Sequence, residues 1–292
     1  MSLKDLSTER RNELSERIDR ATTLEALRII NEEDGRVPAA VGAVLEDIAE
    51  AVDALYARIR DVEARLVYVG AGSSGRIGAM DASELKPTFD FDRAVVLMAG
   101  GIEAFFSAKE ADEDDAAQGA RDVENAKVSL KDCVIGLTAS GRTPYTIGAL
   151  SAAKEKGALT VLISCNPQLK HGFDHEIAID VGPEVISGST RMKSGTAQKL
   201  VLNMMSTVLM VKLGKVYRNM MVDVVPKNEK LIDRAIRIIM DCTGVGRDEA
   251  ERFFGLSGRS AKVAIVMIKR GVDRQDAERM LEKKSITDIV GE

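Results

Sequence analysis

Two short turns rich in serine and glycine carry the side chains of this chain best suited to bind an anion. The first turn (residues 70–78, GAGSSGRIG) and the second turn (residues 138–145, TASGRTPY) each follow a short apolar run. Each offers hydroxyl and backbone N–H groups before a predicted helix, whose N-terminus favours negative charge. Serine and glycine also cap helices without any ligand, but two such turns at equivalent positions favour one shared phosphate site. The predicted ligands are Ser73, Ser74, Gly75, Arg76, Ser140, Gly141, Arg142 and Thr143.

The first turn also matches the G-x-G-x-x-G pattern of dinucleotide-binding proteins, through Gly70, Gly72 and Gly75. That pattern requires an acidic residue about 20 residues further on, which holds the ribose hydroxyls. The next apolar run ends instead in VVLMAGG, with Met98 and Ala99 at this place. The sequence therefore favours a small phosphorylated ligand over a nicotinamide cofactor.

A third candidate segment, SGSTRMKSG at residues 187–195, lies just before a long predicted helix. A helix N-terminus with cations nearby suits a phosphate or a carboxylate. Two alternatives remain open, namely simple helix capping with solvated Arg and Lys side chains and a contact with a second subunit. The predicted ligands in this segment are Ser189, Arg191 and Lys193.

The histidines and cysteines form no comparable pattern. His171 and His175 are the two histidines, but a glycine lies between them and their segment lacks helical periodicity. We therefore expect neither a metal site nor a histidine-based catalytic triad. The three cysteines lie far apart, which predicts a reducing compartment and no disulfide framework.

The elements that would position these turns alternate between short apolar runs and helical segments. Apolar runs without polar alternation are typical of strands buried on both faces of a parallel sheet. With helices between them, they predict an α/β fold with an open, doubly wound, mostly parallel sheet that binds ligands at the carboxyl ends of its strands. The predicted strands are residues 65–70, 94–99, 133–138, 159–164 and 176–181.

Helical sequence lies on both sides of this α/β region. Residues 23–35 and 37–60 have helical apolar spacing, and a long helix is predicted at about 192–213. From about residue 227 onward, glycines separate short helical segments. We therefore expect two domains: residues 1–226, with the N-terminal helices and the sheet, and residues 227–292, a small helical, UBA-like unit.

The composition argues against several other classes of protein. A net charge of −5 over 292 residues is unlike a general nucleic-acid-binding protein, which usually carries a basic face. No apolar run approaches the length of a membrane span, and the charged N-terminal sequence lacks the apolar centre of a signal peptide. We therefore expect a cytoplasmic protein that binds neither nucleic acid nor membrane.

The two turns resemble those of sugar isomerase (SIS) domains, which bind phosphosugars. The segments GAGSSGRIGAMDASELKPTF, RIINEEDGRVPAAV, ISCNP and residues 182–224 closely resemble the N-acetylmuramic acid 6-phosphate etherases, and the similarity covers essentially the whole chain. Glucokinase regulatory protein is a more distant relative without an etherase role. The resemblance implies a homodimeric lyase of bacterial cell-wall and amino-sugar recycling, acting on a phosphorylated amino sugar without a metal or organic cofactor. It would release D-lactate and N-acetylglucosamine 6-phosphate.

The resemblance also implies which residues act as acid and base. In the open-chain sugar, the aldehyde acidifies the proton on carbon 2. Removal of this proton lets the lactyl group leave carbon 3. Water then adds at carbon 3. Two carboxylates with separated pKa values can supply the base and the acid. The resemblance assigns Glu84, in DASE, as the proton donor and Glu113, in the acidic stretch, as the other acid–base group. A phosphosugar isomerase and a non-catalytic phosphosugar-sensing regulator remain alternative functions.

Overall fold

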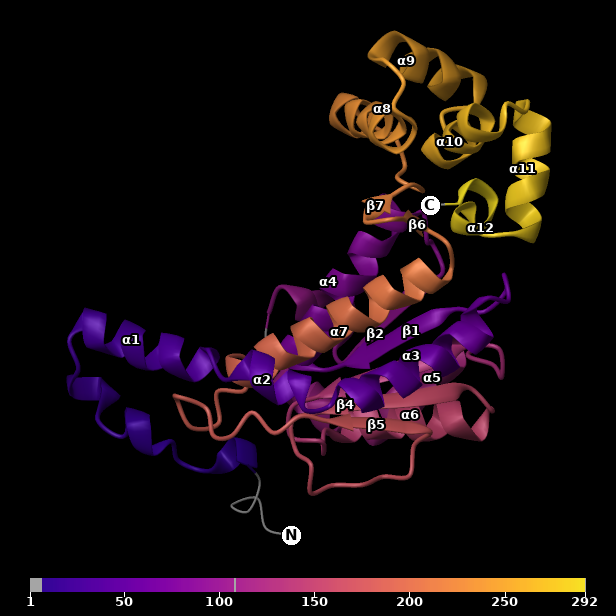
Figure 1. Ribbon diagram of the computed structural model, residues 1–292. Coiled ribbons are helices and arrows are strands. Elements are labelled where there is room, and N and C mark those ends of the chain that lie inside the picture. Colours follow the sequence, from indigo (N-terminus) through magenta and orange to yellow (C-terminus); the bar gives the residue numbers. More distant parts are fainter. Residues whose placement is uncertain (1–6, 108, 292) are drawn as a thin grey trace. The chain divides into compact units, whose positions relative to one another are not determined.

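The computed structural model describes residues 7–107 and 109–291, which form two compact units. The first unit takes its described residues from Met1–Ala82 and Arg93–Ser206, and the second takes them from Ser83–Asp92 and Thr207–Glu292. The division falls inside two long helices, α4 (Gly72–Phe89) and α7 (Lys193–Lys212) (Figure 1). The domain boundary expected after residue 226 stays a prediction.

A five-stranded parallel sheet in the order β2-β1-β3-β4-β5 forms the centre of the first unit. Every residue of β1 and β3 is buried, which explains why their sequences are apolar without alternation. Gly70 at the end of β1 lies between Met98 of β2 and Leu137 of β3. The strands are β1 (Leu66–Gly70), β2 (Ala94–Met98), β3 (Cys133–Thr138), β4 (Leu159–Ser164) and β5 (His175–Ala178). The predicted doubly wound parallel sheet is confirmed.

Helices cover both faces of this sheet. On one face, α5 (Ala116–Asn125) and α6 (Pro144–Glu155) pack over a core that includes Val67 and Val69 of β1. Side chains alternate along a strand, so the neighbouring Tyr68 points to the opposite face. The first and second turns follow β1 and β3, which are adjacent, and therefore lie side by side at the carboxyl edge of the sheet.

One buried carboxylate joins three elements on the face opposite α5 and α6. The Tyr68 hydroxyl donates a 2.8 Å hydrogen bond to Asp81 of α4. Asp81 also accepts hydrogen bonds from the side chains of Asn203 and Ser206 of α7, both at 3.0 Å. Burial raises the pKa of Asp81, and these donors act in the opposite direction. The network fixes the beginning of α4, where the first turn lies, against β1 and α7.

From Ser7 onward, the described part of the N-terminal segment contains three short 3₁₀ helices followed by three α-helices. Thr22 and Glu25 form a capping box at the start of α1. The helix predicted over residues 37–60 is divided in two, because Val44 has a φ of −117°, outside the helical region. The elements are η2 (Ser7–Glu9), η3 (Glu13–Ser15), η4 (Ile18–Arg20), α1 (Thr23–Asp34), α2 (Val37–Gly42) and α3 (Leu45–Ile59).

The second unit contains a short hairpin and five helices around a core of its own. The sequence predicted the helices but not the hairpin, whose two strands have only two residues each. Gly244 and Gly271 end two of the helices in the left-handed conformation typical of C-terminal caps. The elements are β6 (Val216–Tyr217), β7 (Met220–Met221), α8 (Glu229–Thr243), α9 (Arg247–Leu256), α10 (Ala261–Arg270), α11 (Arg274–Lys283) and α12 (Ile286–Val290). Among the described residues, no helix is both long and apolar enough to cross a membrane.

Candidate active site

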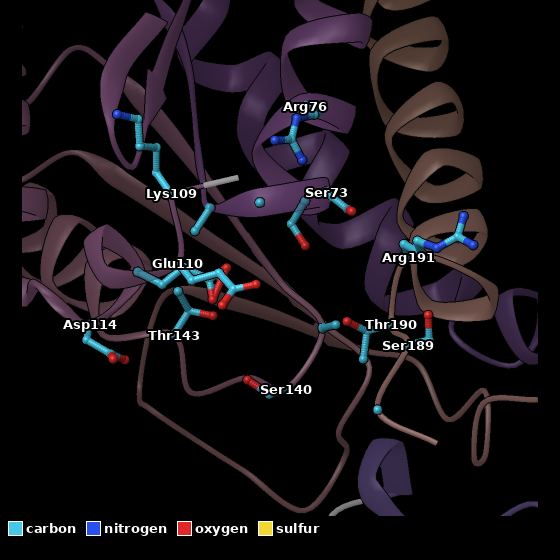
Figure 2. A pocket seen from close by; sticks show the side chains of 16 residues that line it. Ser73, Arg76, Lys109, Glu110, Asp114, Ser140, Thr143, Ser189, Thr190 and Arg191 are labelled. Carbon is cyan, nitrogen blue, oxygen red and sulfur yellow. The ribbon is translucent and has the colours of Figure 1, made fainter. Parts of the chain in front are cut away.

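A cavity of about 750 Å³ opens at the carboxyl edge of the sheet within the first unit (Figure 2). Four segments line it: residues 71–76 of the first turn, residues 109–114, residues 139–143 of the second turn, and the loop at 188–191. In Figure 2, Glu110 and Thr143 lie on one side of the cavity, and Ser189, Thr190 and Arg191 lie on the other. Of the predicted site residues, those that line it are Ser73, Ser74, Arg76, Glu113, Ser140, Thr143, Ser189 and Arg191.

The first turn brings the start of α4 next to a carboxylate. Gly72 has a φ of +52°, in the left-handed region, and a Cβ atom at this position would lie 3.1 Å from Oε1 of Glu113. Glycine at this place therefore leaves room for the Glu113 carboxylate. The first N–H groups of α4 have no partner within the helix, so an anion in the cavity would find donors there.

The second turn is held by hydrogen bonds among its own side chains. Thr138 and Thr143 share a hydrogen bond of 2.8 Å between their hydroxyl oxygens. The Ser140 hydroxyl accepts a 3.1 Å hydrogen bond from the backbone N–H of Arg142, and Nε2 of His171 lies 2.7 Å from the carbonyl oxygen of Gly141. These contacts leave the Ser140 and Thr143 hydroxyls at the cavity surface in a fixed geometry.

Four carboxylates lie in the short helix η6 (Glu110–Asp114), and three of them line the cavity. Glu110, Glu113 and Asp114 line the cavity, whereas Asp112 does not. Glu113 is half-buried, and burial raises its pKa, with further increases from the negative charges of Asp114 and Glu110. A carboxylate with a raised pKa is a stronger base in its ionised form and a useful acid in its protonated form.

The cations that line the cavity differ in what their side chains already bind. The Arg76 guanidinium donates hydrogen bonds to the backbone carbonyls of Ala104 (2.7 Å) and Phe105 (3.2 Å). Lys109 forms a 3.1 Å ion pair with Glu103. Arg191 is exposed and has no ion-pair partner among residues 7–107 and 109–291. Arg191 is therefore the cation best placed to meet an anionic ligand.

Lys193 was predicted as a ligand, but the structure places it away from this cavity. Its side chain is buried, and Nζ donates a 2.5 Å hydrogen bond to Glu33 at the end of α1. Its backbone N–H donates to Glu184. Although burial acts to raise the pKa of Glu33, hydrogen bonds from Lys193 and Asn12 hold that pKa below its usual value. Lys193 thus anchors the start of α7 to α1.

Four other predicted site residues do not line the cavity. Gly75 packs the first turn onto the sheet, since a Cβ atom there would lie 2.7 Å from the carbonyl oxygen of Gly70. Gly141 is buried and Arg142 is exposed. Glu84 is an exposed residue of α4, twelve residues after Gly72 and thus more than three helical turns further along.

The structure also adds residues that the sequence did not single out as site residues. Lys109, Glu110, Asp114 and Thr190 all line the cavity. All four lie within four residues of a predicted site residue, so their position in the sequence was a usable signal. The acidic stretch suggested a solvated helix face, and only the folded chain shows which of its carboxylates line the cavity.

The chain is similar along nearly its whole length to proteins named N-acetylmuramic acid 6-phosphate etherase. It is 50% identical to that of Lactobacillus johnsonii over 287 residues, covering 97% of this chain and 96% of the relative. It is 50% identical to that of Yersinia pestis over 287 residues, covering 97% of each. The etherase 1 of Bacillus licheniformis is 47% identical over 285 residues, covering 96% of this chain and 93% of the relative. Two domain families also match: the glucokinase regulatory protein N-terminal SIS domain over residues 47–154, and the SIS domain over residues 115–208.

Solved structures share the fold at low sequence identity. A protein of E. coli CFT073 is similar with a TM-score of 0.50 at 18% identity, covering 68% of this chain and 96% of that one. A Bacteroides fragilis protein, described as a candidate phosphosugar isomerase of capsule formation, has a TM-score of 0.52 at 17% identity, covering 66% and 92%. At these identities the likeness establishes the fold alone.

Proposed function

The chain belongs to the family of N-acetylmuramic acid 6-phosphate etherases, and we propose that it cleaves the D-lactyl ether of N-acetylmuramic acid 6-phosphate. The products are N-acetylglucosamine 6-phosphate and D-lactate, formed by elimination followed by addition of water. One observation carries this proposal: the Glu113 carboxylate lies beside Gly72, in the same cavity as the hydroxyl groups of both turns.

The hydroxyl groups of the two turns bind the phosphate of the substrate in this proposal. Ser73, Ser74, Ser140 and Thr143 offer donors at the cavity surface, and the free N–H groups at the start of α4 add a favourable dipole. Arg191 offers a cation for the phosphate or for the lactyl carboxylate. Binding through the phosphate places the sugar carbons within reach of η6.

Glu113 acts as the base in the elimination. Its carboxylate takes the proton from carbon 2 of the open-chain sugar, and the electron pair of that bond forms the double bond as the C3–O bond to lactate breaks. Water then adds at carbon 3 and gives its proton to the carboxylate of Glu84, the proton donor described below, while Glu113 returns a proton to carbon 2. Burial and the neighbouring carboxylates raise the pKa of Glu113, so its conjugate base accepts a proton more readily than an exposed glutamate.

Glu84 donates the proton to the departing lactyl oxygen in this proposal, from the second copy in a homodimer. Two observations support that assembly: Glu84 is exposed and does not line this cavity, and exposed apolar side chains such as Leu24 and Leu27 of α1 favour burial against a partner. Hybrids of Glu84→Gln and Glu113→Gln chains provide the test. If each site takes one glutamate from each copy, hybrids regain activity that neither parent has. Inactive hybrids would contradict the shared site.

Incubation of the protein with N-acetylmuramic acid 6-phosphate tests the activity itself. We expect stoichiometric D-lactate and N-acetylglucosamine 6-phosphate, measured by an enzymatic lactate assay and by NMR. A phosphosugar isomerase would instead convert an aldose phosphate to a ketose phosphate without releasing lactate. A sensing regulator would bind the phosphosugar and leave it unchanged. Either result without lactate would contradict the etherase proposal.

We also propose that the protein acts in the cytoplasm. The three cysteines, Cys133, Cys165 and Cys242, are buried and unpaired, as is usual in a reducing compartment. Burial raises the pKa of the Cys133 thiol and of the Cys165 thiol to about 12, so both are unreactive at neutral pH. Cell fractionation with detection of the protein tests this location.

A further inference from the structure

Arg76 is the fifth residue of α4 and lines the cavity. Its guanidinium donates hydrogen bonds to backbone carbonyl groups. One terminal nitrogen donates to the carbonyl of Ala104 at 2.7 Å and to that of Ser107 at 3.4 Å, while Nε donates to the carbonyl of Phe105 at 3.2 Å. Three acceptors around one planar group fix both its position and its orientation. These bonds use Nε and one terminal nitrogen, so the donors that fix the guanidinium are directed at the backbone and only the other terminal nitrogen remains for a ligand.

The three acceptors belong to the end of the short helix η5 (Gly101–Phe105) and the residues just after it. Carbonyls at a helix C-terminus have no partner within the helix, and a cation there is favourable. The backbone N–H groups of Phe106 and Ser107 both donate to Glu103, so they leave the carbonyls of Ala104 and Phe105 free. Arg76 therefore caps η5 from a neighbouring helix.

The capped segment leads directly to the carboxylates of the cavity. From Ser107 only six positions separate the Arg76 contacts from Glu113. The ion pair between Lys109 and Glu103 adds a second connection between η5 and the start of η6. The start of α4 thus contacts η6 and the segment before it, because Gly72 lies beside Glu113 and Arg76, one helical turn later, holds the residues that lead to η6.

We propose that Arg76 is a positioning residue for the acid–base group and not a phosphate ligand: its guanidinium holds residues 101–107 against the start of α4, which keeps the Glu113 carboxylate beside Gly72. The catalytic part of this inference rests on the proposed etherase function. The structural part, that Arg76 orders residues 101–107 and 109–114, stands independently of it.

The test compares Arg76→Gln and Arg76→Lys with Arg191→Gln, which removes an exposed, cavity-lining cation that has no ion-pair partner among the described residues. We expect Arg76→Gln to lower kcat about 10²-fold, the cost of misplacing a catalytic group by about 1 Å. KM and the inhibition constant of N-acetylglucosamine 6-phosphate stay within about threefold, since misplacing the base removes transition-state rather than ground-state interactions. Arg76→Lys retains part of the activity. Arg191→Gln gives the opposite pattern, a raised KM and weaker product inhibition.

Two further readouts separate positioning from a merely structural role. Hydrogen exchange should accelerate in residues 101–107 and 109–114 of Arg76→Gln but not in β1 and β3. Loosening of this segment also hydrates Glu113 and lowers its pKa, so the acidic limb of the kcat profile moves to lower pH. A general loss of stability would not move that limb.

Several outcomes would overturn the proposal. A rise of tenfold or more in KM and in the inhibition constant, with kcat unchanged, would make Arg76 a phosphate ligand. Unchanged hydrogen exchange in residues 101–107 and 109–114 would show that Arg76 does not order these residues. If Arg76→Gln fails to fold, Arg76→Lys is judged by the same criteria. If the wild-type protein releases no lactate, the proposed function fails, whereas the exchange data still decide the role of Arg76.

Discussion

The two serine turns share a sequence pattern and a place in the topology, yet their surroundings differ. SSGR follows β1 and ASGR follows β3, and both precede a helix. Arg76 of the first turn lines the cavity and binds the segment that leads to Glu113, whereas Arg142 of the second turn is exposed and does not line it. Gly72 of the first turn touches Glu113, whereas Gly141 of the second turn faces Leu169 and Ser164.

The difference indicates that equivalent turns of one sheet edge can serve different parts of a reaction. The connection after β2 carries η5 and η6 over the first turn, so this turn can couple ligand binding to the acid–base group. The second turn meets a loop that contains His171, which contacts the Gly141 carbonyl. We therefore expect changes at Gly72 and Arg76 of the first turn to affect kcat, whereas the hydroxyl groups of both turns affect binding.

The largest expected effect is at the carboxylate beside the first turn. Glu113→Gln should lower kcat by about 10²- to 10⁴-fold, because it removes one member of an acid–base pair. Binding of N-acetylglucosamine 6-phosphate, measured by calorimetry, should change little. Asp112→Asn is the matched control, since Asp112 lies in the same short helix but does not line the cavity. Near-normal turnover by Glu113→Gln would show that the first turn does not lie beside the acid–base group, and the proposed difference between the two turns would be wrong.

The hydroxyls of both turns should act together on binding. A hydrogen bond to a charged group contributes about 1.5–3 kcal/mol, so the double change Ser74→Ala and Ser140→Ala should weaken product binding by about 10²-fold or more. The fold should remain intact, as judged by thermal unfolding. Ser187→Ala, outside the cavity, should bind normally. If the double variant binds N-acetylglucosamine 6-phosphate as well as the wild-type protein does, the serine hydroxyl groups of the two turns do not bind the phosphate.

Alanine at the two glycines with positive φ compares the turns directly. Gly72→Ala and Gly141→Ala should each cost about 1–2 kcal/mol of stability, because an L-residue is strained in the left-handed region. Gly72→Ala alone should also lower kcat, since its Cβ would lie 3.1 Å from Oε1 of Glu113. Steady-state kinetics at a temperature where both variants are folded measure the difference. Equal kcat values for the two variants would contradict the coupling at the first turn.

The smallest expected effect is electrostatic. Burial is the main cause of the raised pKa of Glu113, and Asp114 and Glu110 add to it. Removing one negative charge with Glu110→Gln should therefore lower the pKa of Glu113, so its ionised form persists to more acidic pH. The acidic limb of the kcat profile should then shift to lower pH, whereas Asp112→Asn should leave it in place. A shift to higher pH would have the wrong sign for this account.

The sequence predicted the sheet well because buried parallel strands have a simple signature. The predicted runs 65–70 and 133–138 carry no charged side chain after Arg65, and they form the strands β1 and β3 in the structure. The hairpin β6–β7 was not predicted, since strands of two residues are too short for periodicity to indicate them. The division between α2 and α3 was also missed, because the apolar spacing continues across a break that depends on the backbone at Val44.

The candidate site was predictable where the chemistry lies in a local motif, and less so where it depends on distant partners. The serines of both turns line the cavity as expected. Lys193 was predicted as a ligand, and its partner Glu33 lies 160 residues away in the sequence. The acceptors of Arg76 are backbone carbonyls, which every residue has and which therefore give no sequence signal. Glu113 was singled out through family resemblance, since its burial depends on how η6 folds over the first turn.

The most direct test of the central claim, that Glu113 is the base at carbon 2, is the fate of the carbon 2 proton in D₂O. Wild-type protein is incubated with N-acetylmuramic acid 6-phosphate, and the N-acetylglucosamine 6-phosphate formed is analysed by proton NMR alongside lactate release. Elimination and readdition of water predict deuterium at carbon 2 of the product, with Glu113→Gln incorporating it at least about 10²-fold more slowly. Lactate release with the original proton retained at carbon 2, or unchanged incorporation by Glu113→Gln, would contradict the account.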